Sequence, residues 1–259
     1  MRLDVYLVEN SLTESRNKAR TLITEGKVRV DGEFALKPSL NIDGQNVEIV
    51  GEGLKYVSRG ALKLEAALIG FGINPQGCRC VDIGASTGGF TDCLLQFGAD
   101  KVFCVDSGKD QLHNKLRLDP RVVVKEQFNA RNLTKEDIGF LADIAVMDVS
   151  FISQTILHPI VAKILSKNGL FISLIKPQFE AGKEHIGKGG IVKSKEVHKK
   201  VIENVVLSAH NNGLYLCDAL VSPITGGDGN VEYIACFARD SLKQNELLLS
   251  DFIAERLKL

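Results

Sequence analysis

Short apolar runs alternate with helix-like segments over most of the chain beyond residue 80. The runs are rich in Val, Ile, Leu, Phe or Cys and lie at residues 80–83, 101–105, 122–125, 144–147 and 170–175. Apolar strands with helices between them, such as the predicted helix 90–97, are typical of a parallel sheet covered on both faces. Because crossovers between parallel strands are right-handed, the carboxyl ends of these strands are expected at one edge of the sheet.

The pattern changes near the carboxyl terminus. Two strand-like runs, 214–220 and 231–237, follow each other without a helix and are joined by the loop 221–230. This order predicts an antiparallel hairpin beside the parallel strands. The expected fold class is α/β: a Rossmann-like, mostly parallel seven-stranded sheet with a terminal antiparallel hairpin.

The first 50 residues have a pattern of their own. Residues 3–8 predict a short helix, and a second helix is expected to be capped by Ser15 and to end at Gly26. Residues 28–32 then lead through a turn to an extended stretch at 47–50. Two helices and a hairpin make a small α+β unit of about 50 residues.

These patterns divide the chain into four parts. We expect a small domain at 1–50, a linker at 51–57, a large domain at 58–245 and a helix or tail at 246–259. The large domain is expected to open with a helix that Ser58 caps and that Gly70 or Gly72 ends.

Composition narrows the classes of partner and location. Lys and Arg number 32, as do Asp and Glu, so a polyanion would be met by local patches rather than by a globally basic chain. The six cysteines lack the paired spacings of metal sites or disulfides, and no metal site is predicted. No apolar run approaches the roughly 18 to 20 residues of a membrane span. We expect a cytoplasmic protein with no membrane partner.

Five cations cluster around Glu25 in the small domain, namely Arg16, Lys18, Arg20, Lys27 and Arg29. Such a run is usually a solvated face, but the hairpin that follows it favours a functional surface.

A loop of small residues follows the first strand of the large domain. It begins after Asp82, and its glycines at 84, 88 and 89 do not have the Gly-x-Gly-x-x-Gly spacing of dinucleotide folds. Asp106 ends the next strand, where an acidic side chain accepts hydrogen bonds from ribose hydroxyls. Past the third strand, Glu126 or Asn129 could reach an adenine edge. The alternative is a tight turn in which Asp106 only caps.

Four motifs occur in order along the large domain: Tyr56-Val57-Ser58-Arg59-Gly60-Ala61-Leu62-Lys63-Leu64, Asp82-Ile83-Gly84-Ala85-Ser86-Thr87-Gly88-Gly89-Phe90-Thr91-Asp92, Asp148-Val149-Ser150-Phe151-Ile152-Ser153, and Leu174-Ile175-Lys176-Pro177-Gln178-Phe179-Glu180. They resemble the motifs of FtsJ-like methyltransferases, and most closely those of the TlyA family of ribosomal RNA cytidine 2′-O-methyltransferases, historically also labelled hemolysins. The stretches Arg2-Leu3-Asp4, 15–19 and 26–32 resemble the small RNA-binding module first described in ribosomal small-subunit protein four.

The resemblance implies S-adenosylmethionine as cofactor and ribosomal RNA or ribosomal subunits as partner, with no DNA. It implies a catalytic tetrad of Lys63, Asp148, Lys176 and Glu232. The cofactor-binding residues that follow from the motifs and the strand ends are Ser58, Arg59, Gly60, Asp82, Gly84, Ala85, Ser86, Thr87, Gly88, Gly89, Phe90, Thr91, Asp106, Glu126, Asn129 and Asp148. The residues expected at RNA are Arg2, Arg16, Lys18, Arg20, Lys27, Arg29 and Lys188.

The motif after the fourth strand bears on the acceptor of the methyl group. It reads Asp148-Val149-Ser150-Phe151 rather than the Asn/Asp-Pro-Pro-aromatic motif typical of enzymes that methylate exocyclic amines, and no Pro-Cys pair is present for cytosine carbon methylation. An alcohol acceptor remains, for which a lysine is a suitable base. Lys176, directly after the fifth strand, is the expected base.

The basic, glycine-rich segment 178–200 is expected to be a loop that faces RNA over the cleft. Two other functions stay open: a non-catalytic RNA- or ribosome-binding protein, and a membrane-active hemolysin. The target nucleotide, the ribosomal subunit and the oligomeric state are not specified by the sequence.

Overall fold

The computed structural model describes residues 1–51, 55–226, 229–240 and 249–259. The chain forms two compact units, Met1–Arg59 and Gly60–Leu259. Each unit has its own core and is described by itself.

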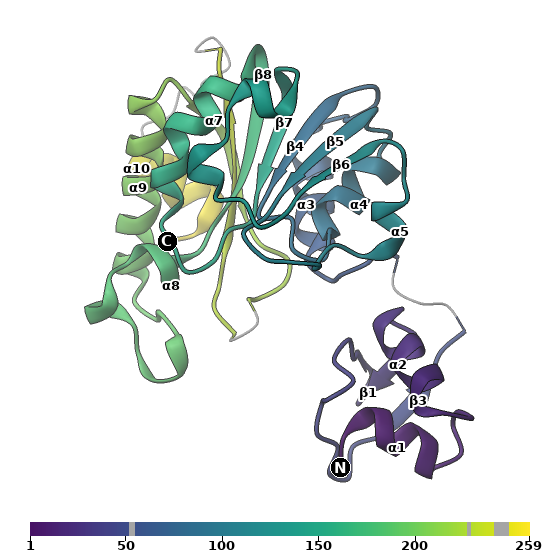
Figure 1. Ribbon diagram of the computed structural model, residues 1–259. Coiled ribbons are helices and arrows are strands. Elements are labelled where there is room, and N and C mark those ends of the chain that lie inside the picture. Colours follow the sequence, from purple (N-terminus) through teal and green to yellow (C-terminus); the bar gives the residue numbers. More distant parts are fainter. Residues whose placement is uncertain (52–54, 227–228, 241–248) are drawn as a thin grey trace. The chain divides into compact units, whose positions relative to one another are not determined.

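The first unit contains two helices and a three-stranded sheet (Figure 1). Helix α1 (Leu3–Glu9) and helix α2 (Arg16–Thr24) precede strands β1 (Val28–Val30), β2 (Glu33–Phe34) and β3 (Val47–Ile49), which pair antiparallel in the order β2-β1-β3. Ser15 caps α2 as predicted, because its hydroxyl accepts a bond of 3.2 Å from the Lys18 amide. The core of the unit consists of Leu3, Leu7, Ala19, Ile23, Val28, Ala35 and Ile42.

The second unit is built on a seven-stranded sheet of order β6-β5-β4-β7-β8-β10-β9. Its strands are β4 (Arg79–Ile83), β5 (Lys101–Val105), β6 (Val122–Lys125), β7 (Ala142–Met147), β8 (Leu165–Ile175), β9 (Tyr215–Val221) and β10 (Tyr233–Ala238). Strand β10 runs antiparallel to both of its neighbours, whereas the pairs from β6 to β8 are parallel. The predicted fold class, including the terminal hairpin, is confirmed.

Helices cover both faces of this sheet. Alternate strand residues, among them Val81, Phe103, Met147 and Phe171, share a core with α7 (His158–Ile164), α9 (Lys195–Asn211) and the carboxyl-terminal elements α10 (Leu249–Phe252) and the π-helical turn Ile253–Leu257. Strand side chains alternate between faces, so the intervening residues point to the other side. Figure 1 shows α3 (Ala61–Gly70) and α4 (Gly89–Gln96) there.

The remaining helical pieces are short. They are α5 (Asn114–Arg117), α6 (Lys135–Ile138), α8 (Pro177–Glu180) and the 3₁₀ turns Ala130–Asn132, Gln154–Leu157, Lys183–His185 and Lys188–Gly190. None of the described helices is both long and apolar enough to cross a membrane.

Two local predictions were wrong. Helix α3 has Gly60 at its N-cap position and no side-chain cap, so Ser58 does not cap it. The segment 178–200 is not one long loop, because α9 already begins at Lys195. The Ser194 hydroxyl caps α9, and Val197, Val201 and Val205 follow at helical spacing and pack in the core. Lys195, Lys199 and Lys200 therefore lie on a helix.

Candidate active site and nucleic-acid interface

The loop between β4 and α4 approaches the end of β7 so closely that Gly84 has no space for a side chain. A Cβ atom at Gly84, whose φ is +82°, would lie 2.6 Å from the Asp148 carbonyl oxygen. Its amide donates 2.9 Å to the carbonyl of Val105. The glycine thus lets the backbone turn across the carboxyl ends of three neighbouring strands.

Asp106 is fixed at the end of β5 by two backbone amides. Its Oδ2 accepts a bond of 2.8 Å from the Ser86 amide, and its Oδ1 accepts one of 2.7 Å from the Gly108 amide. Each carboxylate oxygen keeps a second lone pair, so Asp106 can still accept hydrogen bonds from a ligand.

A cavity of about 510 Å³ opens beside these residues. Of the predicted cofactor residues, Gly84, Ser86, Asp106, Asn129 and Asp148 line it. Other lining residues were not predicted to bind the cofactor. They come from the loops after β5, β6 and β7: Ser107, Gln111, Phe128, Ala130, Arg131, Val149, Ser150, Phe151 and Ile152. Because ligands bind at the carboxyl ends of parallel strands, the position of these loops in the sequence could have indicated them.

The other residues of the glycine-loop motif do not line the cavity, and most of them are buried. Gly88 has a φ of +92°, and a Cβ there would lie 2.2 Å from Leu116 Cδ1. Ala85, Gly89, Phe90 and Thr91 are buried, and Thr87 is exposed but does not line the cavity.

Asp82 is fully buried at the end of β4. Its Oδ2 accepts a bond of 2.7 Å from the Thr91 hydroxyl, whereas its Oδ1 has no partner among the described residues. Burial raises the pKa of Asp82 to about 7. The side chain therefore joins β4 to α4.

Glu126 holds a neighbouring loop. Its two oxygens accept bonds of 2.6 Å from Arg117, and they also bind the amides of Asp110, Gln111 and Leu112. The Arg117 guanidinium lowers the pKa of Glu126 to about 2. Glu126 does not line the cavity and instead positions Gln111, which does. An adenine contact by Asn129 or Glu126 stays a prediction.

The tetrad residues form two ion pairs at the same edge of the sheet. Lys176 Nζ lies 2.5 Å from Asp148 Oδ1, and Lys63 Nζ lies 2.5 Å from Glu232 Oε2. Ile175 pairs with Tyr233 between β8 and β10, which puts Lys176 and Glu232 at adjoining strand ends. The exposed fractions are only 8% for Lys176, 7% for Lys63 and 2% for Glu232.

Two polar side chains near the tetrad were not predicted. Ser150 Oγ accepts a bond of 2.9 Å from Lys176 Nζ, and Gln178 Nε2 donates 3.2 Å to Glu232 Oε1. Ser150 follows Asp148 in its sequence motif and Gln178 follows Lys176 in the next, but nothing in the sequence marked their side chains as tetrad contacts.

Ser58 and Arg59 belong to the first unit, where Arg59 Nη1 lies 3.3 Å from Glu33 Oε2. Gly60 begins the second unit. A cofactor contact by these three residues stays a prediction.

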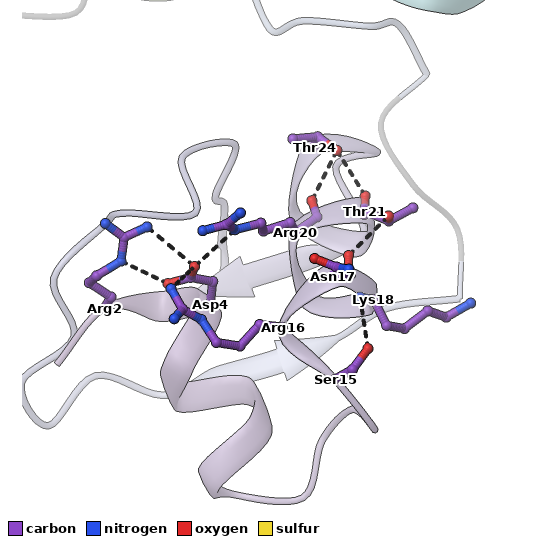
Figure 2. A network of polar contacts seen from close by, with 9 residues as sticks. All are labelled: Arg2, Asp4, Ser15, Arg16, Asn17, Lys18, Arg20, Thr21 and Thr24. Carbon is purple, nitrogen blue, oxygen red and sulfur yellow. Dashed lines mark hydrogen bonds and ion pairs between the residues drawn. The ribbon is translucent and has the colours of Figure 1, made fainter.

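The first unit gathers three arginines around one buried carboxylate (Figure 2). The Asp4 oxygens accept bonds of 2.9 and 3.2 Å from Arg2, 3.0 Å from Arg16 and 3.2 Å from Arg20. The guanidinium of Arg2, above all, holds the pKa of Asp4 well below its usual range. The three arginine side chains stay about half exposed, so the cluster presents cations at fixed positions.

The other predicted RNA residues are arranged differently. The Lys18 side chain extends away from Asp4 in Figure 2, and Lys27 pairs with Glu25 at 2.9 Å. The Arg29 guanidinium lies 4.5 Å from the centre of the Phe34 ring. Lys188 is an exposed residue of a 3₁₀ turn in the second unit.

The cavity fits a nucleoside group with a short polar substituent. The Asp106 carboxylate is available for ribose hydroxyls, and Val105, Phe128, Ala130, Ile152 and Leu157 provide an apolar lining for a base. Gly84 and Asp148, whose backbones approach closely, both line the same cavity.

Comparisons with known proteins assign each of the two units to a family. The FtsJ-like methyltransferase family matches residues 56–239, and the S4 domain matches residues 1–48. A protein named Hemolysin A from Brachyspira hyodysenteriae is 44% identical, with coverage of 92% of this chain and 99% of the relative. The 16S/23S rRNA (cytidine-2′-O)-methyltransferase TlyA of Mycobacterium tuberculosis is also 44% identical, with coverage of 90% of this chain and 87% of the relative.

A solved structure described as a putative hemolysin from Streptococcus thermophilus is 42% identical. It superposes with a TM-score of 0.77 and covers 100% of this chain and 96% of that chain. The chain is thus a member of the FtsJ-like methyltransferases with an S4 domain at its amino end. Within that class it belongs to the TlyA family, as the motifs predicted.

Proposed function

We propose that the protein methylates the 2′-hydroxyl of a cytidine in ribosomal RNA, with S-adenosylmethionine as methyl donor and Lys176 as base. The observation that carries the proposal is the position of Lys176 Nζ, between Asp148 and Ser150, both of which line the cavity. The reaction needs a proton acceptor next to the bound cofactor, and this edge of the sheet provides one.

The cofactor supplies a methyl group on a sulfonium, which is already a good electrophile. The protein then has to align the ribose and remove its proton. Asp148 orients Lys176 through their ion pair, and Glu232 holds Lys63 in the same way. Gly84, Ser86 and Asp106 shape the wall that holds the nucleoside part of the cofactor.

Two exposed groups support an RNA substrate. The arginines around Asp4 present three guanidiniums, which bind phosphates with charge-assisted hydrogen bonds. Phe151 lines the cavity, is 88% exposed and lies 5.1 Å from the Phe179 ring between centroids. An exposed aromatic ring at a catalytic cleft is suited to stack on an unpaired base.

The M. tuberculosis relative is named for cytidines in both 16S and 23S rRNA. We extend the cytidine to this chain because its two units match that relative over most of both chains. The ribosomal subunit is left to experiment.

The test is mass mapping of methylated ribose in ribosomal RNA incubated with the protein and S-adenosylmethionine. We expect one methyl group at a cytidine, and none when that nucleotide carries deoxyribose. A methyl group that persists on the deoxyribose substrate would place the modification on a base and reject the proposal. If no RNA is methylated and calorimetric titration shows no cofactor binding, a non-catalytic RNA-binding role replaces it.

A further inference from the structure

Ser150 lies between the cavity and the buried side chain of Lys176. Among the four tetrad residues only Asp148 lines the cavity, whereas Lys63, Lys176 and Glu232 are buried. Ser150 is exposed, lines the same cavity and accepts the bond of 2.9 Å from Lys176 Nζ. A group that enters the cavity therefore meets Ser150 before it meets Lys176.

The hydroxyl of Ser150 is only half used. A serine hydroxyl has one donor hydrogen and two acceptor lone pairs. Lys176 donates to one lone pair, and no acceptor for the hydroxyl hydrogen is found in the described parts of the chain. The hydrogen can therefore be donated to a group in the cavity or, once Lys176 has lost a proton, to Nζ.

We propose that Ser150 is a further catalytic residue, whose hydroxyl relays the proton of the ribose 2′-hydroxyl to Lys176. This inference rests on the proposed function, because it takes a ribose hydroxyl as nucleophile and Lys176 as base.

The relay balances in atoms and charge. Lys176 first releases one proton to solvent. The ribose 2′-O–H bond then breaks and its proton goes to Ser150 Oγ, while Ser150 passes its own proton to the amine of Lys176. The ribose oxygen forms a bond to the methyl carbon, and the electrons of the carbon–sulfur bond stay on sulfur. One positive charge leaves the sulfonium and one appears on Lys176, next to Asp148.

Asp148 is placed to stabilise the charge on Lys176, whereas Ser150 is placed to transfer the proton. Its Oδ1 lies 2.5 Å from Lys176 Nζ, so it stabilises the ammonium that the relay creates. A carboxylate cannot hold Lys176 and also donate a proton, whereas a hydroxyl both accepts and donates. Ser150 supplies the step that Asp148 cannot.

The experiment measures single-turnover methyl transfer by the full-length protein in mixtures of H₂O and D₂O, for the wild type, Ser150→Ala and Ser150→Thr. A relay moves two protons in one step, so the wild-type rate should curve with the deuterium fraction. Ser150→Ala should be about 100-fold slower, within the usual range for acid–base catalysis, and its rate should fall linearly with the deuterium fraction because a single proton then moves directly to Lys176. Ser150→Thr keeps the hydroxyl and should restore both the rate and the curvature.

Ser166→Ala is the matched control, because Ser166 lies near the other end of β8, the strand that Lys176 follows. It should leave the rate unchanged. Cofactor and RNA affinities, measured by calorimetry and filter binding, should be equal in all variants. The relay is overturned if Ser150→Ala reacts at the wild-type rate, or if its loss of rate is matched by a loss of affinity.

Lys176→Ala in the same assay separates this inference from the proposed function. If Lys176→Ala is inactive and Ser150→Ala is fully active, only the relay is wrong. If both variants react at the wild-type rate, the assignment of the base is wrong as well.

Discussion

Lys176 is the residue on which the proposed chemistry depends most directly. Lys176→Ala removes the amine that takes the proton, and Lys176 does not line the cavity. We therefore expect the rate of methyl transfer to fall by roughly 10²- to 10⁴-fold, while the affinity for S-adenosylmethionine changes little. Single-turnover kinetics and calorimetry measure the two quantities. Lys163→Ala, at an exposed position of α7, is the control. An equal loss of rate and of cofactor affinity would contradict the role of base.

Substitution of Arg16 tests whether a single residue of the first unit contacts an RNA phosphate. Its side chain is 52% exposed, and its guanidinium lies 3.0 Å from Asp4, so it is positioned for a phosphate without being buried. Arg16→Gln should weaken RNA binding and reduce the slope of log affinity against log salt by about 0.7 to 0.9 for each lost phosphate contact. The control is Arg79→Gln, because Arg79 is 48% exposed and also pairs with an aspartate, in the second unit. A salt slope that does not change in Arg16→Gln would show that this arginine makes no phosphate contact.

At the scale of elements, the segment from Lys183 to Val192 is tied to Asn230, two residues before Glu232, and to His198 of α9. Asn230 Oδ1 accepts a bond of 3.0 Å from the Val192 amide, and its Nδ2 donates 2.9 Å to the Gly190 carbonyl. His198 contacts the Val192 carbonyl at 2.9 Å and the Tyr233 hydroxyl at 2.6 Å. These bonds hold the end of this lysine-containing segment close to Glu232 in the chain.

Asn230→Ala should release this segment. Asn230 is almost fully buried, so the substitution leaves the Val192 amide and the Gly190 carbonyl without their partner. We expect faster hydrogen exchange in residues 183–192 and weaker RNA binding, with cofactor affinity nearly unchanged. Asn212→Ala, which removes a bond to the Ser208 carbonyl at the end of α9, is the control. If cofactor affinity falls as much as RNA affinity, the segment does not act on RNA alone.

Periodicity predicted the strands well where an apolar run is uninterrupted. Strands β5 and β6 occur at the predicted residues, because their apolar runs are bounded by polar ones. Strand β8 begins five positions before the predicted residue 170, since Lys167, Asn168 and Gly169 interrupt its pattern. Side-chain pairing was not predictable in the same way. A buried Asp4 and a Ser150–Lys176 bond depend on tertiary contacts that one sequence does not display.

At the scale of the whole molecule, burial shifts the pKa values of two groups in the second unit in opposite directions. Burial lowers the pKa of His158 from 6.5 to about 4 and raises that of Asp82 from 3.8 to about 7. Unfolded His158 binds a proton that the folded protein rejects, so stability rises with pH between about 4 and 6.5. Folded Asp82 keeps a proton that the unfolded chain has lost, so stability falls as the pH rises from about 4 to about 7.

Each shift corresponds to roughly 3 to 4 kcal/mol over its window, so the two contributions largely cancel in the wild type. His158→Gln removes one of them, and the stability of this variant should fall with rising pH between 4 and 7. Asp82→Asn, which can still accept the Thr91 bond, should show the opposite slope. Urea unfolding of the full-length protein without cofactor, followed through the transition of the larger unit, gives the free energy at each pH. Subtracting the wild-type curve removes the contribution of other groups, including Glu180, whose pKa burial also raises. If the two difference curves slope in the same direction with pH, one of these side chains is not buried in the folded protein.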